Sequence, residues 1–140
     1  IQKKVNECQV VELSDGVLLL NMRSYHGANC RAIAKSGDGG ATWSEITHDE
    51  TLVEPICQAG ILKLSDGTIA FSNPASTKRE NMIVRFSTDD CQTWEKSVVL
   101  HEGPSAYSDL AEAADGSVFC LYERGDRTPY EKITLARISL

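Results

Sequence analysis

Residues 36–43 read SGDGGATW, and residues 87–94 read STDDCQTW. Both segments fit the pattern SxDxxxTW, and the second begins 51 residues after the first. We expect the aspartate of each segment to accept hydrogen bonds from backbone N–H groups across a hairpin, and the tryptophan to pack between sheets. Cys91 stands where the first copy has Gly40, and a positive φ angle is expected there, so the second turn is predicted to be slightly strained.

A second motif repeats at the same spacing. The sequence LSDG surrounds Asp15 and again Asp66, and the shorter ADG contains Asp115. These aspartates are separated by 51 and 49 residues. Two independent motifs that share one period indicate an internal repeat of about 50 residues.

Each repeat is predicted to consist of short antiparallel strands, because Asp-Gly is a strong hairpin signal and no segment shows a helical period over about ten residues. The predicted strands cover residues 10–13, 17–22 and 30–35, with a fourth starting at 41–43; then 59–64, 68–72 and 81–86, with a fourth starting at 93–94; then 109–113, 117–122 and 133–138. Four-stranded antiparallel units of about 40–50 residues are typical of β-propeller blades. The predicted fold class is therefore all-β, a propeller of which this chain supplies about three blades.

The predicted blades cover about residues 1–50, 51–100 and 101–140. The third has no SxDxxxTW segment and no clear fourth strand. Propellers usually contain about four to eight blades, and three alone would leave open sheet edges and an unsealed core. We therefore expect the chain to be part of a larger propeller.

The composition argues against several classes of protein. The formal net charge is −6 over 140 residues, with acidic and basic residues interspersed, so no nucleic-acid surface is predicted. No apolar stretch reaches the roughly eighteen residues of a membrane span. The five cysteines show neither a CxxC pair nor metal-ligand spacing, so no metal or other cofactor is predicted, and their disulfide state stays open.

Three polar residues occupy equivalent positions in the three repeats. Glu7, Gln58 and Tyr107 each lie eight residues before the Asp-Gly turn of their unit, at the predicted start of the innermost strand. Innermost strands surround the propeller axis, so these side chains are expected to be neighbours at one mouth of the channel. A carboxylate can accept the proton of a phenol, whose ordinary pKa is about 10, and we expect the Tyr107 hydroxyl within about 3 Å of a Glu7 oxygen. The alternative is that both residues only close a polar channel.

Two arginines follow the second strand of neighbouring units. Arg23 ends that strand in the first unit, and Arg79 lies in the loop after it in the second. Guanidinium groups bind carboxylates in a planar fork, so the pair predicts a site for an anionic ligand at the same mouth. Each arginine alone could equally be exposed surface, and Arg31, which begins a strand, is predicted to face solvent. Glu123 and Arg124 follow the corresponding strand of the third unit, in a less regular register.

The SxDxxxTW segments resemble the Asp-box (BNR) repeat of the sialidase, or neuraminidase, superfamily. Residues 6–25 (NECQVVELSDGVLLLNMRSY) look like the sialidase segment that carries a carboxylate partner and the second arginine of an arginine triad. Residues 71–79 (FSNPASTKR) look like the segment of the third arginine, and residues 105–110 (SAYSDL) like that of the nucleophilic tyrosine. The resemblance covers nearly the whole chain and implies the C-terminal part of a single catalytic propeller, six-bladed in the full protein.

Carried over residue by residue, the resemblance implies that Tyr107 is the nucleophile, Glu7 its base partner, and Arg23 and Arg79 the groups that bind the substrate carboxylate. The implied activity is that of an exo-α-sialidase, which releases terminal sialic acids with retention of configuration. The implied substrates are sialylated glycans of glycoproteins, gangliosides and oligosaccharides. The implied setting is secreted, periplasmic or cell-surface, with a lysosomal location as an alternative.

The family also needs a first arginine and an aspartate acid/base, for which this sequence offers no candidate. The chain alone is therefore expected to be inactive and to need the N-terminal blades of the same propeller. Three alternatives stay open: a trans-sialidase or intramolecular sialidase on the same site, a non-catalytic Asp-box binding module, and a glycosidase with two carboxylates. The last would need a second acid facing the channel, where this sequence has Gln58 and Tyr107.

Overall fold

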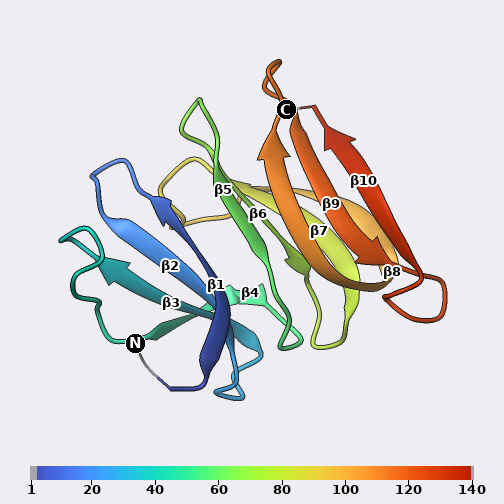
Figure 1. Ribbon diagram of the computed structural model, residues 1–140, viewed down its shortest axis with the longest axis horizontal. Helices are drawn as coiled ribbons and strands as arrows, with labels where there is room; N and C mark the ends of the chain where they lie inside the picture. Colours follow the sequence, from blue (N-terminus) through green and yellow to red (C-terminus); the bar gives the residue numbers. More distant parts are fainter. Residues whose placement is uncertain (1–2, 140) are drawn as a thin grey trace.

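The computed structural model describes residues 3–139, which fold into antiparallel β-strands joined by short turns (Figure 1). The strands are β1 (Val5–Glu12), β2 (Leu18–Ser24), β3 (Cys30–Ser36), β4 (Thr47–Val53), β5 (Gly60–Lys63), β6 (Ile69–Pro74), β7 (Glu80–Ser87), β8 (Lys96–Glu112), β9 (Val118–Arg124) and β10 (Lys132–Ile138). This confirms the prediction of an all-β chain. Residues 3–139 contain no helix long and apolar enough to cross a membrane.

The strands form two sheets, in the orders β1-β2-β3-β4 and β10-β9-β8-β7-β6-β5. The long strand β8 joins the second and third repeats, because residues 96–104 pair with β7 and residues 105–112 pair with β9. The second repeat thus contains four strand segments and the third contains three. In Figure 1 the three groups of strands lie side by side, with β1, β5 and the second half of β8 as the first segments of their groups.

The fourth strand of each of the first two repeats begins later than predicted. We predicted that these strands start at residues 41–43 and 93–94, whereas β4 begins at Thr47 and β8 at Lys96. The reason is the turn itself, because the backbone N–H groups of Thr42 and Thr93 donate to an aspartate side chain and not to a neighbouring strand. The chain therefore joins the sheet only after the threonine and tryptophan.

The two SxDxxxTW turns share one hydrogen-bond pattern. Asp38 accepts the Thr42 N–H at 2.9 Å and the Thr42 hydroxyl at 2.5 Å. Asp89 accepts the Thr93 N–H at 2.9 Å and the Thr93 hydroxyl at 2.6 Å. These bonds, with one from the neighbouring serine, lower the pKa of both aspartates to about 2. Cys91 has φ 63°, so the predicted departure from ordinary backbone geometry at this position is confirmed.

Apolar side chains fill the two spaces between the three groups of strands. The first core joins Val11 and Leu19 of the first sheet to Phe71 of β6. Trp94 packs against this core, and the centres of the Trp94 and Phe71 rings are 5.6 Å apart. The second core joins β6 and β7 to β9 and β10. Trp94 therefore lies between two sheets, as predicted, and it links the first repeat to the second.

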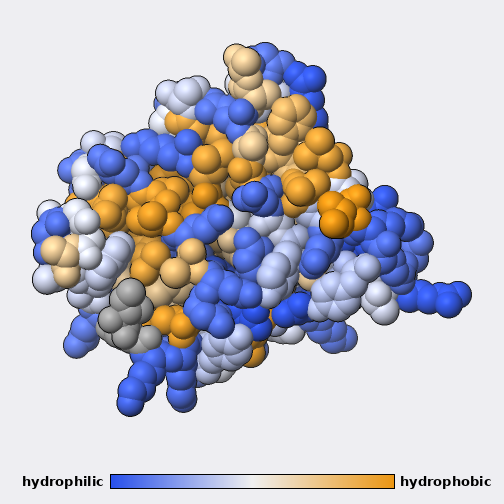
Figure 2. All heavy atoms as spheres, in the orientation of Figure 1, coloured by the Kyte–Doolittle hydropathy of each residue, from blue (hydrophilic) through white to orange (hydrophobic). Residues whose placement is uncertain are grey.

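Further apolar groups lie on the outer faces of this arrangement. Trp43 packs against Leu20 and Met22 on the face of the first sheet that does not meet β5–β7. At the other end, Ile133 and Leu135 of β10 are 74% and 60% exposed. Figure 2 shows apolar side chains gathered over the region of β1 and β2 and again over β9 and β10. The outer faces of the first and third repeats thus present apolar side chains, as do the faces that pack against each other between the repeats.

Candidate functional site

The innermost strands of the three repeats lie next to one another. The Gln9 side chain on β1 accepts the backbone N–H of Ile61 on β5 at 2.8 Å. The Gln58 side chain accepts the Ser108 N–H at 3.0 Å and donates to the Ser108 carbonyl at 2.9 Å, which ties β5 to β8. Gly60 permits this approach, since a Cβ atom there would lie 3.3 Å from the Ser108 carbonyl oxygen. The structure therefore confirms that the backbone segments carrying the three equivalent positions lie next to one another.

Glu7 and Tyr107 both sit at irregularities in their strands. The pairing of β1 with β2 shifts between Asn6 and Cys8, so Glu7 is the extra residue, with φ 40°. The pairing of β8 with β9 shifts between Ser105 and Ser108, a stretch that includes Tyr107. Bulges of this kind redirect a side chain out of the regular alternation of the strand. Two independent bulges therefore turn the carboxylate and the phenol toward each other.

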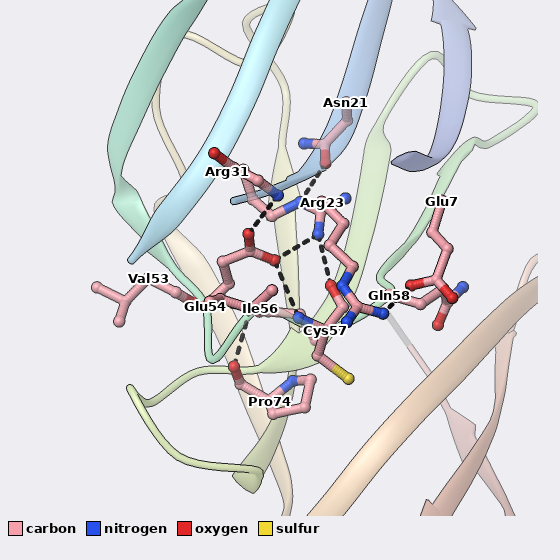
Figure 3. A network of polar contacts seen from close by, with 12 residues as sticks. Glu7, Asn21, Arg23, Arg31, Val53, Glu54, Ile56, Cys57, Gln58 and Pro74 are labelled. Atoms are coloured by element: carbon pink, nitrogen blue, oxygen red, sulfur yellow. Dashed lines mark hydrogen bonds and ion pairs between the residues drawn. The ribbon is translucent and has the colours of Figure 1, made fainter. Parts of the chain in front are cut away.

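The Tyr107 hydroxyl donates to Glu7 Oε1 at 2.5 Å, within the distance expected from the sequence. Arg23 Nη1 lies 3.2 Å from the same hydroxyl oxygen and also forms an ion pair with Glu7 Oε2. The Glu7 and Arg23 side chains meet in Figure 3, where Arg23 extends from the end of β2. The three polar heads form a closed triangle in which the phenol oxygen touches both an acceptor and a cation.

The charges of this triangle set its resting protonation state. Burial opposes ionisation of Glu7, but hydrogen bonds from Tyr107 and Arg23 and the charges of Arg23 and Arg79 outweigh it and lower the pKa of Glu7. The hydrogen bond to Glu7, together with burial, raises the pKa of Tyr107. The resting pair is thus a neutral phenol beside an ionised carboxylate, with the proton on tyrosine.

Arg79 lies on the other side of the Tyr107 ring. It comes from the loop between β6 and β7, and its guanidinium carbon is 5.7 Å from the centre of that ring. Its Nη1 donates to the Tyr130 hydroxyl at 2.5 Å, and its Nη2 donates to the Ile56 carbonyl at 3.4 Å. The structure therefore brings together all four predicted site residues, Glu7, Arg23, Arg79 and Tyr107, around one phenol.

The sequence predicted the residues around this cluster only in part. Glu123 accepts the backbone N–H of Tyr107 at 3.0 Å, so it holds the strand that carries the phenol. Arg124 points elsewhere and donates to Thr134 at 2.9 Å. Tyr130 lies in the loop between β9 and β10, which is longer than the equivalent loops between β2 and β3 and between β6 and β7, so the repeat does not predict its position.

The prediction that Arg31 faces solvent is wrong. Arg31 is 1% exposed and forms an ion pair with Glu54, also 1% exposed, at 2.7 Å. Its first neighbours on β3, Cys30 and Ala32, are buried as well, so the strand does not alternate where it begins. The sheet is covered on both faces there, and a charged residue in this stretch must find a buried partner.

A surface hollow of about 380 Å³ also borders Tyr107, between Gln58 and Glu123. It does not touch Glu7, Arg23 or Arg79, so it lies beside the cluster and not over its charged groups. No group of three or more His, Cys, Asp or Glu side chains in residues 3–139 is placed to hold a metal ion. The five cysteines have free thiols in this structure.

Comparison with known proteins places this chain in a family. The model of the BNR repeat-like domain matches residues 1–120. A sialidase of Micromonospora viridifaciens is 37% identical over 142 aligned residues, which cover 94% of this chain and 22% of that protein. The chain belongs to the BNR-repeat sialidase superfamily.

Solved structures of this superfamily share the fold. The Hadza microbial sialidase Hz136 superposes with a TM-score of 0.82 and 35% identity, over 98% of this chain and 28% of that one. The intramolecular trans-sialidase of Ruminococcus gnavus superposes with a TM-score of 0.79 and 25% identity, over 95% of this chain and 32% of that one. The chain thus spans about a quarter of the length of its sialidase relatives, and its fold is a partial propeller.

Proposed function

We propose that this chain supplies the C-terminal three blades, at about residues 1–50, 51–100 and 101–140, of a single catalytic propeller with exo-α-sialidase activity. The observation that carries the proposal is the Tyr107 hydroxyl, which donates to Glu7 while Arg23 and Arg79 flank it. A binding module that only recognised a glycan would not require a phenol with its own proton acceptor. The catalytic assignment therefore accounts for more of the geometry than the non-catalytic one.

A tyrosine suits sialic acid because the anomeric carbon of this sugar carries a carboxylate. A carboxylate nucleophile would approach that carbon against a like charge, whereas a neutral phenol does not. Sialidases with a tyrosine nucleophile are an exception to the usual pair of carboxylates in glycosidases. The neutral state of Tyr107 beside ionised Glu7 is the resting state this chemistry needs.

The reaction then proceeds in two steps. As the Tyr107 oxygen bonds to the anomeric carbon, its proton passes to Glu7, and the bond to the leaving sugar breaks as the sugar oxygen takes a proton from the aspartate acid/base of another blade. Water next attacks the anomeric carbon and gives a proton to that aspartate, while the bond to Tyr107 breaks and Glu7 returns the proton to the phenol oxygen. Two displacements at one carbon release sialic acid with its original configuration.

Arg23 and Arg79 hold the substrate carboxylate in this proposal. Their guanidinium groups lie near the edge and face of Tyr107, so a carboxylate bound between them places the adjoining anomeric carbon over the phenol. Positioning of this kind can supply several kcal/mol of a reaction barrier. Tyr25 stacks on Arg23, with the guanidinium carbon 4.9 Å from its ring centre, and restricts the direction of that arginine.

The remaining catalytic groups come from other blades. A first arginine and an aspartate acid/base complete the site, and the apolar faces around Trp43 and Leu135 bind the blades that carry them. Six blades in total, sialylated glycoproteins, gangliosides and oligosaccharides as substrates, and a secreted, periplasmic, surface or lysosomal setting all belong to this proposal. Without the other blades the chain is inactive.

A second candidate is transfer of the sialyl group in place of hydrolysis. The likeness to the intramolecular trans-sialidase of Ruminococcus gnavus favours it, since the same four residues serve either outcome. The choice depends on whether water or a hydroxyl group of a sugar reaches the glycosyl-tyrosine. Product analysis separates the two, because an intramolecular reaction releases an anhydro sugar and hydrolysis releases free sialic acid.

The test is turnover of a fluorogenic sialoside by the full-length protein and its Tyr107→Phe variant. Loss of the phenol oxygen should reduce kcat/KM by at least the roughly 10²–10⁴-fold typical of a lost proton-transfer partner. Tyr25→Phe is the matched control, because its ring still stacks on Arg23 and it should remain fully active. Equal turnover by Tyr107→Phe and the unmodified protein would end the nucleophile assignment.

A further inference from the structure

We propose that the buried ion pair between Arg31 and Glu54 is a positioning element that fixes the backbone segments carrying Arg23 and Arg79. The inference rests on the proposed function, because it concerns how these arginines are aimed at the substrate carboxylate. Neither Arg31 nor Glu54 touches Tyr107 or Glu7, so the pair acts through other residues. Figure 3 shows Glu54 between Arg31 and the turn that contains Cys57.

The pair is embedded in a set of charge-assisted hydrogen bonds. Arg31 Nη1 donates to Glu54 Oε2 at 2.7 Å and to the Cys57 carbonyl at 2.8 Å, and its Nε donates to Asn21 Oδ1 at 2.6 Å. Strands β2 and β3 and the link between the first two repeats therefore meet at one guanidinium. Because the guanidinium is planar and all of its partners are buried, these hydrogen bonds fix the relative positions of the segments that they join.

The pair controls Arg23 through the next residue along the chain. Glu54 Oε1 accepts the backbone N–H of Ser24 at 2.8 Å, in the buried last position of β2. The peptide bond that ends at this N–H is the one that begins at Arg23. The end of β2 cannot rotate without breaking a hydrogen bond to a buried charge, so the starting direction of the Arg23 side chain is fixed.

The same pair controls Arg79 through Cys57. Glu54 Oε2 accepts the Cys57 N–H at 3.4 Å, and Arg31 donates to the Cys57 carbonyl, so both backbone groups of this residue are held. The preceding carbonyl, that of Ile56, is the acceptor for Arg79 Nη2. Ile56 has φ 55°, an unusual conformation for a β-branched residue that persists only where its surroundings hold it.

The cost of burial supports a role beyond stability. Taking two charges out of water carries a large desolvation penalty, and well-packed apolar residues of similar volume are often as stable or more so. The core beside this pair is already apolar, with Leu52 and Phe71 fully buried. An apolar pair would pack there, but it would leave the Ser24 and Cys57 backbone groups without their partners.

The test compares KM and kcat in the full-length protein with the double variant Arg31→Met/Glu54→Leu. We expect kcat/KM for a fluorogenic sialoside to fall by about 10- to 100-fold, as for misplacement of binding groups by about an ångström, with a rise in KM as part of that loss. The thermal midpoint should fall as well, because the Ser24 and Cys57 backbone groups lose their buried partners. Val84→Ala, in the core between the second and third repeats, is the control that loses stability without a change in KM.

A conservative variant keeps the inference testable if the double variant does not fold. Glu54→Gln preserves the shape of the side chain, but its amide can no longer accept from Ser24, Arg31 and Cys57 together, so KM should again rise. Arg31→Lys should recover part of the loss relative to Arg31→Met. An unchanged KM in folded Glu54→Gln and in the folded double variant would overturn the inference while leaving the proposed function intact.

A second readout does not depend on turnover. Crystal structures of the unmodified protein and Glu54→Gln should differ in the positions of the Arg23 and Arg79 guanidinium groups. If the unmodified protein neither binds nor cleaves sialosides, the proposed function fails, and these positions alone decide the inference. Guanidinium groups that stay in place without the ion pair would overturn it.

Discussion

The Tyr107 hydroxyl donates to Glu7 Oε1 at 2.5 Å, although the two residues are 100 positions apart in the sequence. One sits on a bulge of the first repeat and the other on a bulge of the third, and the Gln58 contacts of the second repeat hold the strands between them. The bond is therefore a product of three blades that curve around a common axis. A single blade could not form it.

Replacement of Glu7 by glutamine tests whether this bond carries a proton during the reaction. Glu7→Gln keeps the hydrogen bond to the phenol but cannot take its proton, so kcat/KM should fall by roughly 10²–10⁴-fold. The measurement is steady-state turnover of a fluorogenic sialoside by the full-length protein. Asp109→Asn, an exposed change on the same strand as Tyr107, should leave turnover unchanged. Full activity of Glu7→Gln would show that the carboxylate only closes a polar channel.

The pH profile reports the protonation state of Glu7. Burial opposes ionisation of Glu7, but hydrogen bonds from Tyr107 and Arg23, with the charges of Arg23 and Arg79, outweigh it and lower the pKa of Glu7 below its ordinary value of 4.5. Activity that requires ionised Glu7 should therefore fall off, on the acid limb of the kcat/KM profile, below pH 4.5. Arg23→Gln removes both a hydrogen bond and a charge that favour the ionised form, so the pKa of Glu7 should rise and this limb should move to higher pH. A limb that moved to lower pH, or did not move, would contradict the assigned contact.

Tyr130 should influence substrate binding through Arg79. Tyr130→Phe removes the hydroxyl that accepts from Arg79 Nη1, and Tyr130 is 61% exposed, so we expect a modest rise in KM of roughly two- to fivefold with kcat unchanged. Arg79→Gln removes the charge itself and should raise KM by about 10- to 100-fold. A larger effect from Tyr130→Phe than from Arg79→Gln would mean that the tyrosine contacts the substrate directly.

The SxDxxxTW turns predict a specific acid sensitivity of folding. Asp89 has a pKa of about 2 in the fold against an ordinary value of 3.8, so the unfolded chain binds the proton more readily. Its stabilising effect is complete above about pH 4 and is lost as the pH falls toward 2. Asp89→Asn should therefore lower the thermal midpoint at pH 6 and approach the unmodified protein near pH 2. A difference between them that is the same at both pH values would exclude this origin.

The repeats explain which parts of the site could be predicted from the sequence. The fixed count of eight residues before each Asp-Gly turn predicted Glu7, Gln58 and Tyr107 near the starts of adjacent inner strands, because equivalent positions in blades of one topology lie at equal distances from the turn. The bulges that turn Glu7 and Tyr107 toward each other leave no mark in composition. The residue count therefore predicted that these three residues are neighbours, whereas the hydrogen bond between Tyr107 and Glu7 depends on bulges that only the structure shows.

The contacts that the sequence could not predict join residues whose pairing the repeat does not specify. Arg31 looks like a surface charge in a short strand, since nothing near it indicates that Glu54, in the link to the next repeat, will be its buried partner. The repeat does not predict the position of Tyr130 beside Arg79, because the β9–β10 loop that carries it is longer than the equivalent loops of the first two repeats. The fourth strands begin late because aspartate side chains compete with the sheet for backbone N–H groups. Each case depends on a partner brought in by tertiary structure.

The covalent intermediate tests the central claim most directly. The full-length protein, mixed with a sialoside and stopped by acid within a single turnover, should carry one sialyl group on the peptide that contains Tyr107, as located by mass spectrometry. The Tyr107→Phe variant should carry none. A sialyl group attached to a carboxylate side chain would contradict the assignment of Tyr107 as the nucleophile, as would full turnover by Tyr107→Phe.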